Sequence, residues 1–285
     1  AFIPACGVCE PCSRGLQNIC DEGARLMTGL AISDNTNRLR THDGLPLTQM
    51  CLLGTFAEHI TVNQASLVKI EDDIPLKEAA LLGCGVATGW GSASEIGGTK
   101  AGDTVVVVGI GGVGINSVQG AVASGARFVV AVDPVPFKRE MAEKMGATHT
   151  FASMEEALPA VGEFTWGKMA NTTIITVGVI EGEMIAPALA LTAKGGQVVV
   201  TGMGPASDID VKLSLFELTL LQKRVQGAIF GGAGPRTQIP NLLNEYRAGK
   251  LNLTDLVTTR YTLDQVNEAY DDMLNGKNIR GMIEF

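Results

Sequence analysis

Four cysteines near the start of the chain have the spacing of a metal site. They are Cys6, Cys9, Cys12 and Cys20, in the pattern CxxCxxCx7C within the run CGVCEPCSRGLQNIC. Short spacers let successive thiolates turn inward around one tetrahedral zinc ion, and the longer spacer returns the fourth ligand. A ferredoxin-type cluster has a shorter last spacer followed by proline, whereas Asp21 follows here. Zinc is the favoured interpretation, and disulfides or unpaired core thiols are the alternatives.

A glycine-rich run in the middle of the chain has the form of a dinucleotide-binding turn. Gly109, Gly111 and Gly114 stand in GxGxxG order within VVVVGIGGVG, directly after an apolar strand. These glycines make the turn, admit a pyrophosphate and allow close helix packing. Asp133 ends the next apolar run, where a carboxylate binds the ribose hydroxyls of NAD and repels the 2′-phosphate of NADP. Lys138 is placed to reach the same ribose. A helix cap at Asp133 and a solvated Lys138 are the structural alternatives.

A further cysteine, Cys84, stands between glycines in LLGCGVATGWGSA. Glycine neighbours leave a thiol accessible from the backbone side, so Cys84 can face a cleft between two domains. A role as a small buried hydrophobic residue, which is common for free cysteines, fits equally well. The residues alone leave both interpretations open.

The elements that position these residues fall into three regions. Residues 1–85 are dominated by turn formers, with strand-like runs at 56–62 and 67–70. Residues 86–228 alternate strands with helices, as in a doubly wound, Rossmann-type α/β sheet, and residues 229–285 form a C-terminal tail. The predicted elements after residue 85 are strands at 105–108, 129–132, 173–177 and 197–200, helices after Gly112 and at 136–145, 184–192, 240–246 and 265–274, and a closing strand in IRGMIEF.

Composition limits the partners of the protein. The chain has 285 residues, 46% hydrophobic and 18% charged, with 35 glycines and a formal net charge of −8. Nucleic acid and anionic membranes need clustered Lys and Arg, and the charges here form no such block. No apolar run reaches the roughly 18 residues of a membrane span, and the first residues do not form a signal peptide. We therefore expect neither nucleic acid nor a membrane as a partner, and a cytoplasmic location.

Five motifs in register resemble the zinc-dependent medium-chain alcohol dehydrogenases over essentially the whole chain. They are CGVCEPCSRGLQNIC, GCGVATGWG, VVVVGIGGVG with VVAVD, QGAIFGG and GKNIRGMIEF. The resemblance implies an incomplete, mostly β catalytic domain with a structural zinc lobe at 1–85, a Rossmann cofactor domain at 86–228 and a return to the catalytic domain at 229–285. The implied activity is zinc-assisted hydride transfer between an alcohol or aldehyde and NAD.

The resemblance also assigns roles to individual residues. It implies a structural zinc at the four-cysteine cluster and Cys84 as the third protein ligand of a catalytic zinc. Thr88 and Val113 match positions that contact the nicotinamide. Arg280 matches an arginine that pairs with the pyrophosphate, and Phe230 one that packs near the cofactor. The implied cofactor-binding residues are Gly109, Gly111, Gly112, Val113, Gly114, Asp133, Lys138, Phe230 and Arg280.

Within this family, LGTFAEHITV and LLGCGVATGWGSA look most like bacterial nicotinoprotein, dye-reducing alcohol dehydrogenases and thiol-dependent formaldehyde dehydrogenases. A zinc-independent, quinone-reductase-like or non-catalytic relative, in which Cys84 is only a core thiol, is a further alternative. A zinc-ribbon nucleic-acid module is disfavoured by the acidic balance and the dominating α/β region.

The chain departs from the family pattern at the catalytic zinc. The family takes two earlier ligands, a cysteine and the histidine of a GHE motif, and neither motif is present. The chain opens in what should be the middle of a strand, so we expect roughly 90 preceding residues in a family-length protein. His42, His59 and His149 fall in a polar loop, a strand and a strand edge, and we interpret them as structural or solvent-facing.

Family and composition together predict a homodimer or a higher oligomer. The apolar segment 225–230 would form an exposed sheet edge in a monomer.

Two substitutions test the roles expected for Asp133 and for the cysteine cluster. Replacing Asp133 should change cofactor choice without affecting the glycine turn, and Cys12→Ser should release zinc without directly altering the nucleotide pocket.

Overall fold

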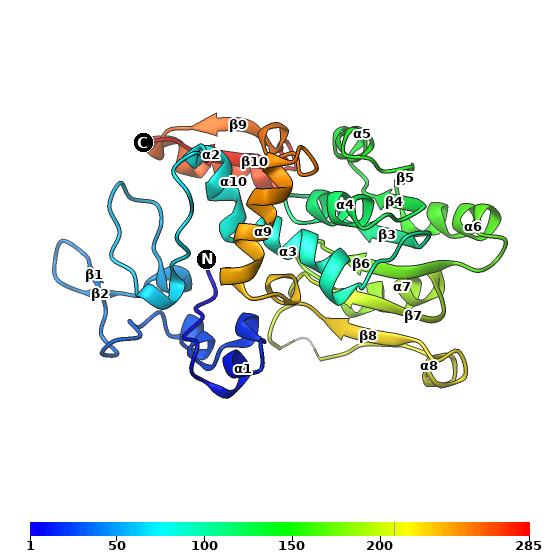
Figure 1. The fold of residues 1–285 in the computed structure, drawn as a ribbon, viewed down its shortest axis with the longest axis horizontal. Helices are drawn as coiled ribbons and strands as arrows, with labels where there is room; N and C mark the ends of the chain where they lie inside the picture. Colours follow the sequence, from blue (N-terminus) through cyan, green and yellow to red (C-terminus); the bar gives the residue numbers. More distant parts are fainter. Residues whose placement is uncertain (208) are drawn as a thin grey trace.

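A six-stranded parallel sheet forms the centre of the protein in the computed structural model, which describes residues 1–207 and 209–285 (Figure 1). Its strands are β3 Thr104–Val108, β4 Phe128–Val132, β5 His149–Phe151, β6 Ala170–Ile175, β7 Thr192–Val200 and β8 Arg224–Gly227. They lie in the spatial order β5–β4–β3–β6–β7–β8, that of a doubly wound dinucleotide-binding sheet. The strands predicted at 105–108, 129–132, 173–177 and 197–200 are confirmed as β3, β4, β6 and β7, and β5 adds a short one that no apolar run indicated.

Helices cover both faces of this sheet. The helices of the described residues, not all of which contact the sheet, are α1 Glu10–Ser13, α2 Leu76–Ala80, α3 Gly85–Gly91, α4 Gly114–Ala123, α5 Pro136–Lys144, α6 Met154–Phe164, α7 Ile185–Leu191, α8 Leu215–Leu220, α9 Pro235–Arg247 and α10 Val266–Leu274. Val105 and Val107 pack in the cluster that holds α4 and α5, whereas Val106 and Val108 pack with α6 and α7. A strand buried on both faces needs a continuous apolar run, and β3 is four valines after Thr104. Among the described residues, no helix is both long and apolar enough to cross a bilayer.

Helix α3 packs against α4 through glycines. A Cβ atom on Gly89 would lie 2.0 Å from the carbonyl oxygen of Val113, and one on Gly120 would lie 2.8 Å from that of Trp90. Glycine disfavours a helix in isolation, which is why α3 was not predicted, but here it permits close backbone approach. The crossing brings the beginning of α3, next to Cys84, to the glycine-rich turn before α4.

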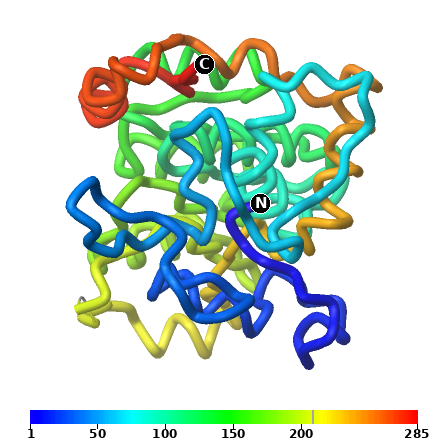
Figure 2. Tube along the Cα trace, turned by 90° about the vertical axis from the view of Figure 1, so that its left-hand side faces the viewer, coloured from blue at the N-terminus to red at the C-terminus, as the bar shows by residue number. Residues whose placement is uncertain are grey.

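Residues 1–75 lie at one end of the molecule and carry little regular structure (Figures 1 and 2). Their only strands, in the part of the chain that the structure describes, are the pair β1 Leu39–Arg40 and β2 Pro46–Leu47. The predicted strands at 56–62 and 67–70 are wrong, because neither segment has a hydrogen-bonded neighbouring strand among the described residues. Phe56 and Ile60 of the first segment are exposed.

The C-terminal segment returns to the end that holds the first residues (Figure 1). Strand β9 Val257–Tyr261 pairs in parallel with β10 Arg280–Ile283. The two predicted helices and the closing strand are confirmed, although α9 begins earlier than expected, at Pro235, a residue suited to a first helical position. Arg247 at the end of α9 forms ion pairs with Glu71 and Asp73, and so joins this segment to the first region.

Candidate functional site

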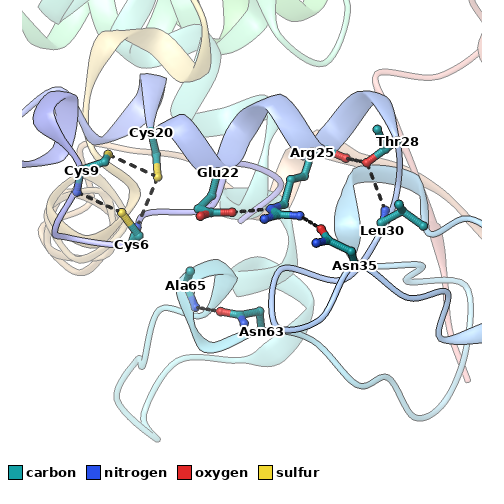
Figure 3. A network of polar contacts seen from close by, with 10 residues as sticks. All are labelled: Cys6, Cys9, Cys20, Glu22, Arg25, Thr28, Leu30, Asn35, Asn63 and Ala65. Atoms are coloured by element: carbon teal, nitrogen blue, oxygen red, sulfur yellow. Dashed lines mark hydrogen bonds and ion pairs between the residues drawn. The ribbon is translucent and has the colours of Figure 1, made fainter.

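The four cysteines predicted to bind zinc converge in space, and Figure 3 shows three of them. The Sγ atoms of Cys6 and Cys12 are 3.9 Å apart, as are those of Cys9 and Cys20, and all four lie within 4.8 Å of one another. Tetrahedral Zn–S bonds of about 2.3 Å separate the sulfurs by about 3.8 Å, whereas a disulfide needs about 2.05 Å. The cluster therefore fits one zinc ion and is too open for disulfides. Among the described residues it is the one group of three or more candidate ligands within metal-binding distance.

Backbone hydrogen bonds prepare one of these sulfurs for a negative charge. The N–H groups of Val8 and Cys9 donate to Cys6 Sγ at 3.5 and 3.4 Å, and they lower the pKa of Cys6 to about 7. Burial has the opposite effect on Cys12 and Cys20, raising the pKa of Cys20 to about 12. A bound metal cation would deprotonate all four thiols, including those whose pKa is raised by burial, because a thiol that coordinates a metal loses its proton.

A polar network crosses the loop that follows the cysteine cluster (Figure 3). Arg25 forms an ion pair with Glu22 and donates a hydrogen bond to Asn35. Thr28 donates to the carbonyl of Arg25 and accepts from the N–H of Leu30. The 3-10 helix Asp21–Met27 buries none of its residues fully, and Leu26 packs only at the edge of the apolar core, so hydrogen bonds contribute most of the order of this stretch.

The glycine-rich turn has the geometry that its glycines predict. Gly109 has a φ of 88°, in the left-handed region that favours glycine. A Cβ atom on Gly114 would lie 1.8 Å from the carbonyl oxygen of Gly109, so only glycine fits there. A Cβ atom on Gly111 would meet nothing within 4 Å. The backbone at Gly111 is thus open to a ligand, at the position where a pyrophosphate approaches in this type of turn.

Asp133 is buried at the end of β4, with 4% of its surface exposed. Its Oδ2 accepts from the N–H of Ile110 at 2.7 Å, and its Oδ1 accepts from the N–H of Val135 at 2.9 Å. The N-cap of α5 is Val135, so Asp133 is not the helix cap. Because this carboxylate holds the turn residue Ile110, we now expect that replacing Asp133 would also disturb the glycine turn. Each oxygen keeps a further lone pair for a ribose hydroxyl.

A cavity of about 410 Å³ opens beside this carboxylate. Gly109, Gly111, Asp133, Lys138 and Thr176 line it. Thr176, which the sequence did not single out, donates through Oγ1 to the carbonyl oxygen of Gly109 at 2.5 Å. The cavity therefore gathers the glycine turn, the carboxylate and the lysine predicted for one end of a dinucleotide.

Arg280, at the start of β10, lies over the other side of the glycine turn. A Cβ atom on Gly112 would lie 2.3 Å from Cδ of Arg280, and one on Gly85 would lie 3.4 Å from its Nη1. These contacts bring together three segments that are far apart in the sequence. A guanidinium at the glycine turn suits the charge of a pyrophosphate.

Cys84 and Thr88 stand at the beginning of α3, next to that arginine. The Cys84 side chain is exposed, yet surrounding protein atoms raise the pKa of its thiol, and the charge of Arg280 opposes this effect. Thr88 is buried, and its Oγ1 makes no hydrogen bond of ordinary geometry among the described residues, although it lies near enough to the Cys84 thiol to act against the rise in that thiol's pKa. A buried polar atom without a partner is uncommon in native proteins and fits a position that a ligand satisfies. Val113 is partly exposed at the N-cap of α4.

The structure limits what other predicted residues can do. Phe230 has no exposed surface, and its ring packs on that of Phe2 with centroids 5.7 Å apart, so it supports the site from the core and does not face the ligand. His42 and His59 are exposed outside any strand. His149 lies in β5 and stacks on Phe164, with ring centroids 4.3 Å apart.

Comparison with known proteins agrees with a dehydrogenase fold that carries a zinc lobe. The family model of the zinc-binding dehydrogenases matches residues 112–247. A zinc-binding-domain alcohol dehydrogenase from Burkholderia ambifaria superposes with a TM-score of 0.90 and 27% identity, covering 99% of this chain and 75% of that one. Benzyl alcohol dehydrogenase from Acinetobacter calcoaceticus gives a TM-score of 0.87 and 26% identity, with coverage of 99% and 75%. These matches define the class as zinc-binding dehydrogenases.

Within the zinc-binding dehydrogenases, two of the proteins most similar to this chain in sequence are alcohol dehydrogenases. Alcohol dehydrogenase B of Mycobacterium tuberculosis is 50% identical over 285 residues, which are 100% of this chain and 76% of that protein. The NDMA-dependent alcohol dehydrogenase of Amycolatopsis methanolica is 50% identical over 283 residues, or 99% of this chain and 76% of that protein. The chain belongs to the alcohol dehydrogenases of the zinc-binding dehydrogenase family. The predicted resemblance is confirmed, and membership implies zinc and a nicotinamide cofactor.

Proposed function

We propose that the protein transfers hydride between an alcohol and NAD, with Cys84 as one ligand of a catalytic zinc. The observation that carries this proposal is the contact between Gly85 and the glycine turn. A Cβ atom on Gly85 would lie 3.1 Å from the carbonyl oxygen of Gly112 and 3.4 Å from Nη1 of Arg280. Cys84 therefore adjoins the point where the candidate pyrophosphate site meets its arginine, close enough for a substrate held there to face the bound cofactor.

The cofactor would lie along the edge of the sheet. Gly109, Gly111, Gly112, Val113 and Gly114 would form its pyrophosphate turn. Asp133 would accept the ribose hydroxyls while its charge disfavours NADP, and Lys138 in the same cavity would support that ribose. Arg280 would pair with the pyrophosphate. The unpartnered hydroxyl of Thr88 and the side chain of Val113 would contact the nicotinamide end.

Two zinc roles follow from the cysteines. Cys6, Cys9, Cys12 and Cys20 would hold a structural ion, which their sulfur distances fit. Cys84 would supply one ligand of a second ion, but a catalytic zinc takes three protein ligands. Among the described residues no two other candidate ligands accompany Cys84, so these residues do not hold that ion by themselves.

The chemistry proposed for the bound groups is Lewis acidity from zinc and hydride acceptance by the nicotinamide. The residues of this chain would supply placement. The close packing of α3 on α4 fixes Cys84 and Thr88 relative to the glycine turn, and Asp133 fixes the turn itself through Ile110. Fixed placement of reacting groups is a large part of what an enzyme contributes to such a transfer.

A second mode of turnover is favoured by the NDMA-dependent relative at 50% identity. In this mode the cofactor stays bound, and an external dye-like acceptor oxidises the NADH formed in each turnover back to NAD. A thiol-dependent formaldehyde dehydrogenase is the weaker alternative. It is favoured only by the S-(hydroxymethyl)glutathione dehydrogenase of Photobacterium damsela at 34% identity.

We also infer a homodimer formed across β8. This strand is the edge of the large sheet, and all its residues are exposed. Leu215 and Phe216 of the neighbouring α8 are 72% and 73% exposed. An unpaired edge flanked by apolar side chains is stabilised by pairing with a second copy. Sedimentation showing a stable monomer at micromolar concentration would refute this inference.

The proposed reaction is tested on the full-length protein isolated without added cofactor. We expect about two zinc ions per chain, NAD among the small molecules released on denaturation or bound on addition, and alcohol-dependent reduction of NAD or of a dye. Cys84→Ala should abolish turnover and remove one zinc while NAD binding persists. Full activity in Cys84→Ala, or a wild-type protein with one zinc and no NAD binding, would refute the proposal.

A further inference from the structure

A single side chain joins the cysteine cluster to a turn 211 residues later in the chain. Asn18 lies between Cys12 and Cys20 and is 7% exposed. Its Nδ2 donates to the carbonyl oxygen of Ile229 at 3.2 Å. Only the donor half of the amide is used, because Asn18 Oδ1 has no hydrogen-bond partner among the described residues.

The carbonyl that Asn18 reaches is the one that closes a tight turn. Ile229 also accepts from the N–H of Gly232 at 3.0 Å. The two residues between them, Phe230 and Gly231, have φ values of 51° and 69°. This left-handed pair is the backbone of a type I′ turn, which a bulky residue such as Phe rarely adopts. Phe230 is held there by complete burial, so the turn carries strain that a second donor to its closing carbonyl helps to offset.

The turn presses directly on helix α3. A Cβ atom on Gly231 would lie 2.5 Å from the carbonyl oxygen of Ala87 and 2.9 Å from that of Thr88. A Cβ atom on Gly91 would lie 2.4 Å from the carbonyl oxygen of Gly231. With no space between the two backbones, a shift of the turn must move Thr88 or open a gap beside it.

We propose that Asn18 is a positioning residue for the nicotinamide end of the cofactor site. The amide of the zinc lobe fixes the type I′ turn, and the turn fixes Thr88. The inference rests on the proposed function, because it takes the unpartnered hydroxyl of Thr88 as a contact of the nicotinamide. It also corrects the expectation that the cysteine lobe acts without direct effect on the nucleotide pocket.

The neighbouring residue provides a matched control. Gln17 carries the same amide group and lies against Gly234, whose added Cβ would be 2.7 Å from Gln17 Oε1. Gln17 Oε1 is buried without a hydrogen-bond partner among the described residues. Removing such a group costs little, because no made hydrogen bond is lost.

The test compares Asn18→Ala and Gln17→Ala in the full-length, zinc-loaded protein, with NAD and ADP-ribose as separate ligands. Asn18→Ala should weaken NAD binding by about three- to tenfold, the effect of losing one neutral hydrogen bond. ADP-ribose, which lacks the nicotinamide, should bind as to the wild type. Gln17→Ala should change neither affinity. Equal weakening of both ligands by Asn18→Ala, or no weakening of either, would overturn the proposal.

Hydrogen exchange at the Gly232 amide supplies a readout that does not depend on cofactor binding. Protection there should fall in Asn18→Ala, while zinc content stays at the wild-type level. Asn18→Leu, which keeps the volume without the donor, should behave alike if Asn18→Ala folds poorly. Loss of zinc in both variants would make Asn18 part of the lobe itself and refute the positioning role. A wild-type protein that binds neither ligand would refute the proposed function, and the Gly232 measurement would still decide the contact.

Discussion

The cysteine lobe and the six-stranded sheet are ordered by different physical means. In the sheet, Val105, Val106 and Val107 are wholly buried, and helices cover both faces. In the lobe, α1 is a single turn, and the 3-10 helix that follows Cys20, the last cysteine of the cluster, buries none of its residues fully. Hydrophobic burial stabilises the first region, whereas converging thiols and polar contacts hold the second.

This difference implies two kinds of vulnerability. A domain with a large apolar core tolerates the loss of any one surface contact, because its stability is spread over many side chains. A lobe built around four sulfurs depends on a few groups, since structural zinc binding and folding share one free energy. A single substitution in either region therefore tests this difference, and we expect the loss of stability to be larger in the lobe.

The largest effect is expected from Cys12→Ser. Structural zinc sites contribute on the order of 10 kcal/mol, and removing one thiolate loses much of this. We expect loss of lobe zinc and of hydrogen-exchange protection over residues 6–28, while the amides of β3 stay protected. NAD binding should weaken as well, because Asn18 lies between Cys12 and Cys20. Metal analysis and exchange mass spectrometry measure these outcomes.

Cys51→Ser is the control for this experiment. Cys51 is half-buried and lies outside the cluster, so its replacement should leave the zinc content unchanged. If Cys12→Ser kept its zinc and its protection, the lobe would be stabilised by packing after all. The contrast between the two regions would then be lost.

The same contrast explains which parts of the fold could be predicted from sequence. Strand β3 pairs with β4 in register from Thr104 and Phe128 onward, and each run of valines marks a strand because burial on both faces requires it. The runs at 56–62 and 67–70 also look like strands, but they find no neighbouring strand among the described residues. Apolar patterning identifies a strand only when a partner strand is in place.

For the site as well, local sequence patterns could be predicted, whereas contacts between distant segments could not. The cysteine spacing and the glycine turn are local patterns with a direct chemical reason, and the structure brings both sets together. Asn18 and Ile229 could not be linked from sequence, because no local pattern marks a contact across 211 residues. Helix α3 was missed because its glycines argue against a helix until the close approach of α4 is known.

An intermediate effect is expected from Gly114→Ala within the sheet region. The added Cβ would lie 1.8 Å from the carbonyl oxygen of Gly109 and 2.5 Å from Thr176 Oγ1. The Gly109 carbonyl belongs to the backbone and cannot yield without moving the end of β3, so the free energy of unfolding should fall by about 3 kcal/mol, the upper end of the usual cost of overpacking. Gly111→Ala is the matched control, since its Cβ meets nothing within 4 Å, and it should unfold like the wild type while binding NAD less well. Denaturant titration distinguishes the two, and equal stability would contradict the close packing at Gly114.

The smallest effect is expected from Asp133→Asn, which tests a polar contact inside the apolar region. Both carboxylate oxygens accept from backbone N–H groups, those of Ile110 and Val135. An asparagine has one oxygen, so its amide nitrogen must face the other N–H and leave that donor unsatisfied. Such a loss costs about 1–3 kcal/mol. NAD should bind about tenfold or more weakly, since each 1.4 kcal/mol is tenfold, and the preference over NADP should fall as the charge is removed.

Asp103→Asn shows whether this effect belongs to the doubly used carboxylate. Asp103 stands just before β3, and its Oδ2 accepts from the N–H of Lys100 at 2.8 Å. An asparagine there can turn its oxygen to that one donor, so stability and NAD binding should stay near wild-type values. If Asp133→Asn also stayed near wild type in both, the carboxylate would neither hold the glycine turn nor select NAD. The sheet would then keep its stability even when a buried polar contact at the site is lost. The difference in sensitivity between the sheet and the cysteine lobe would be larger than the two hydrogen bonds of Asp133 imply.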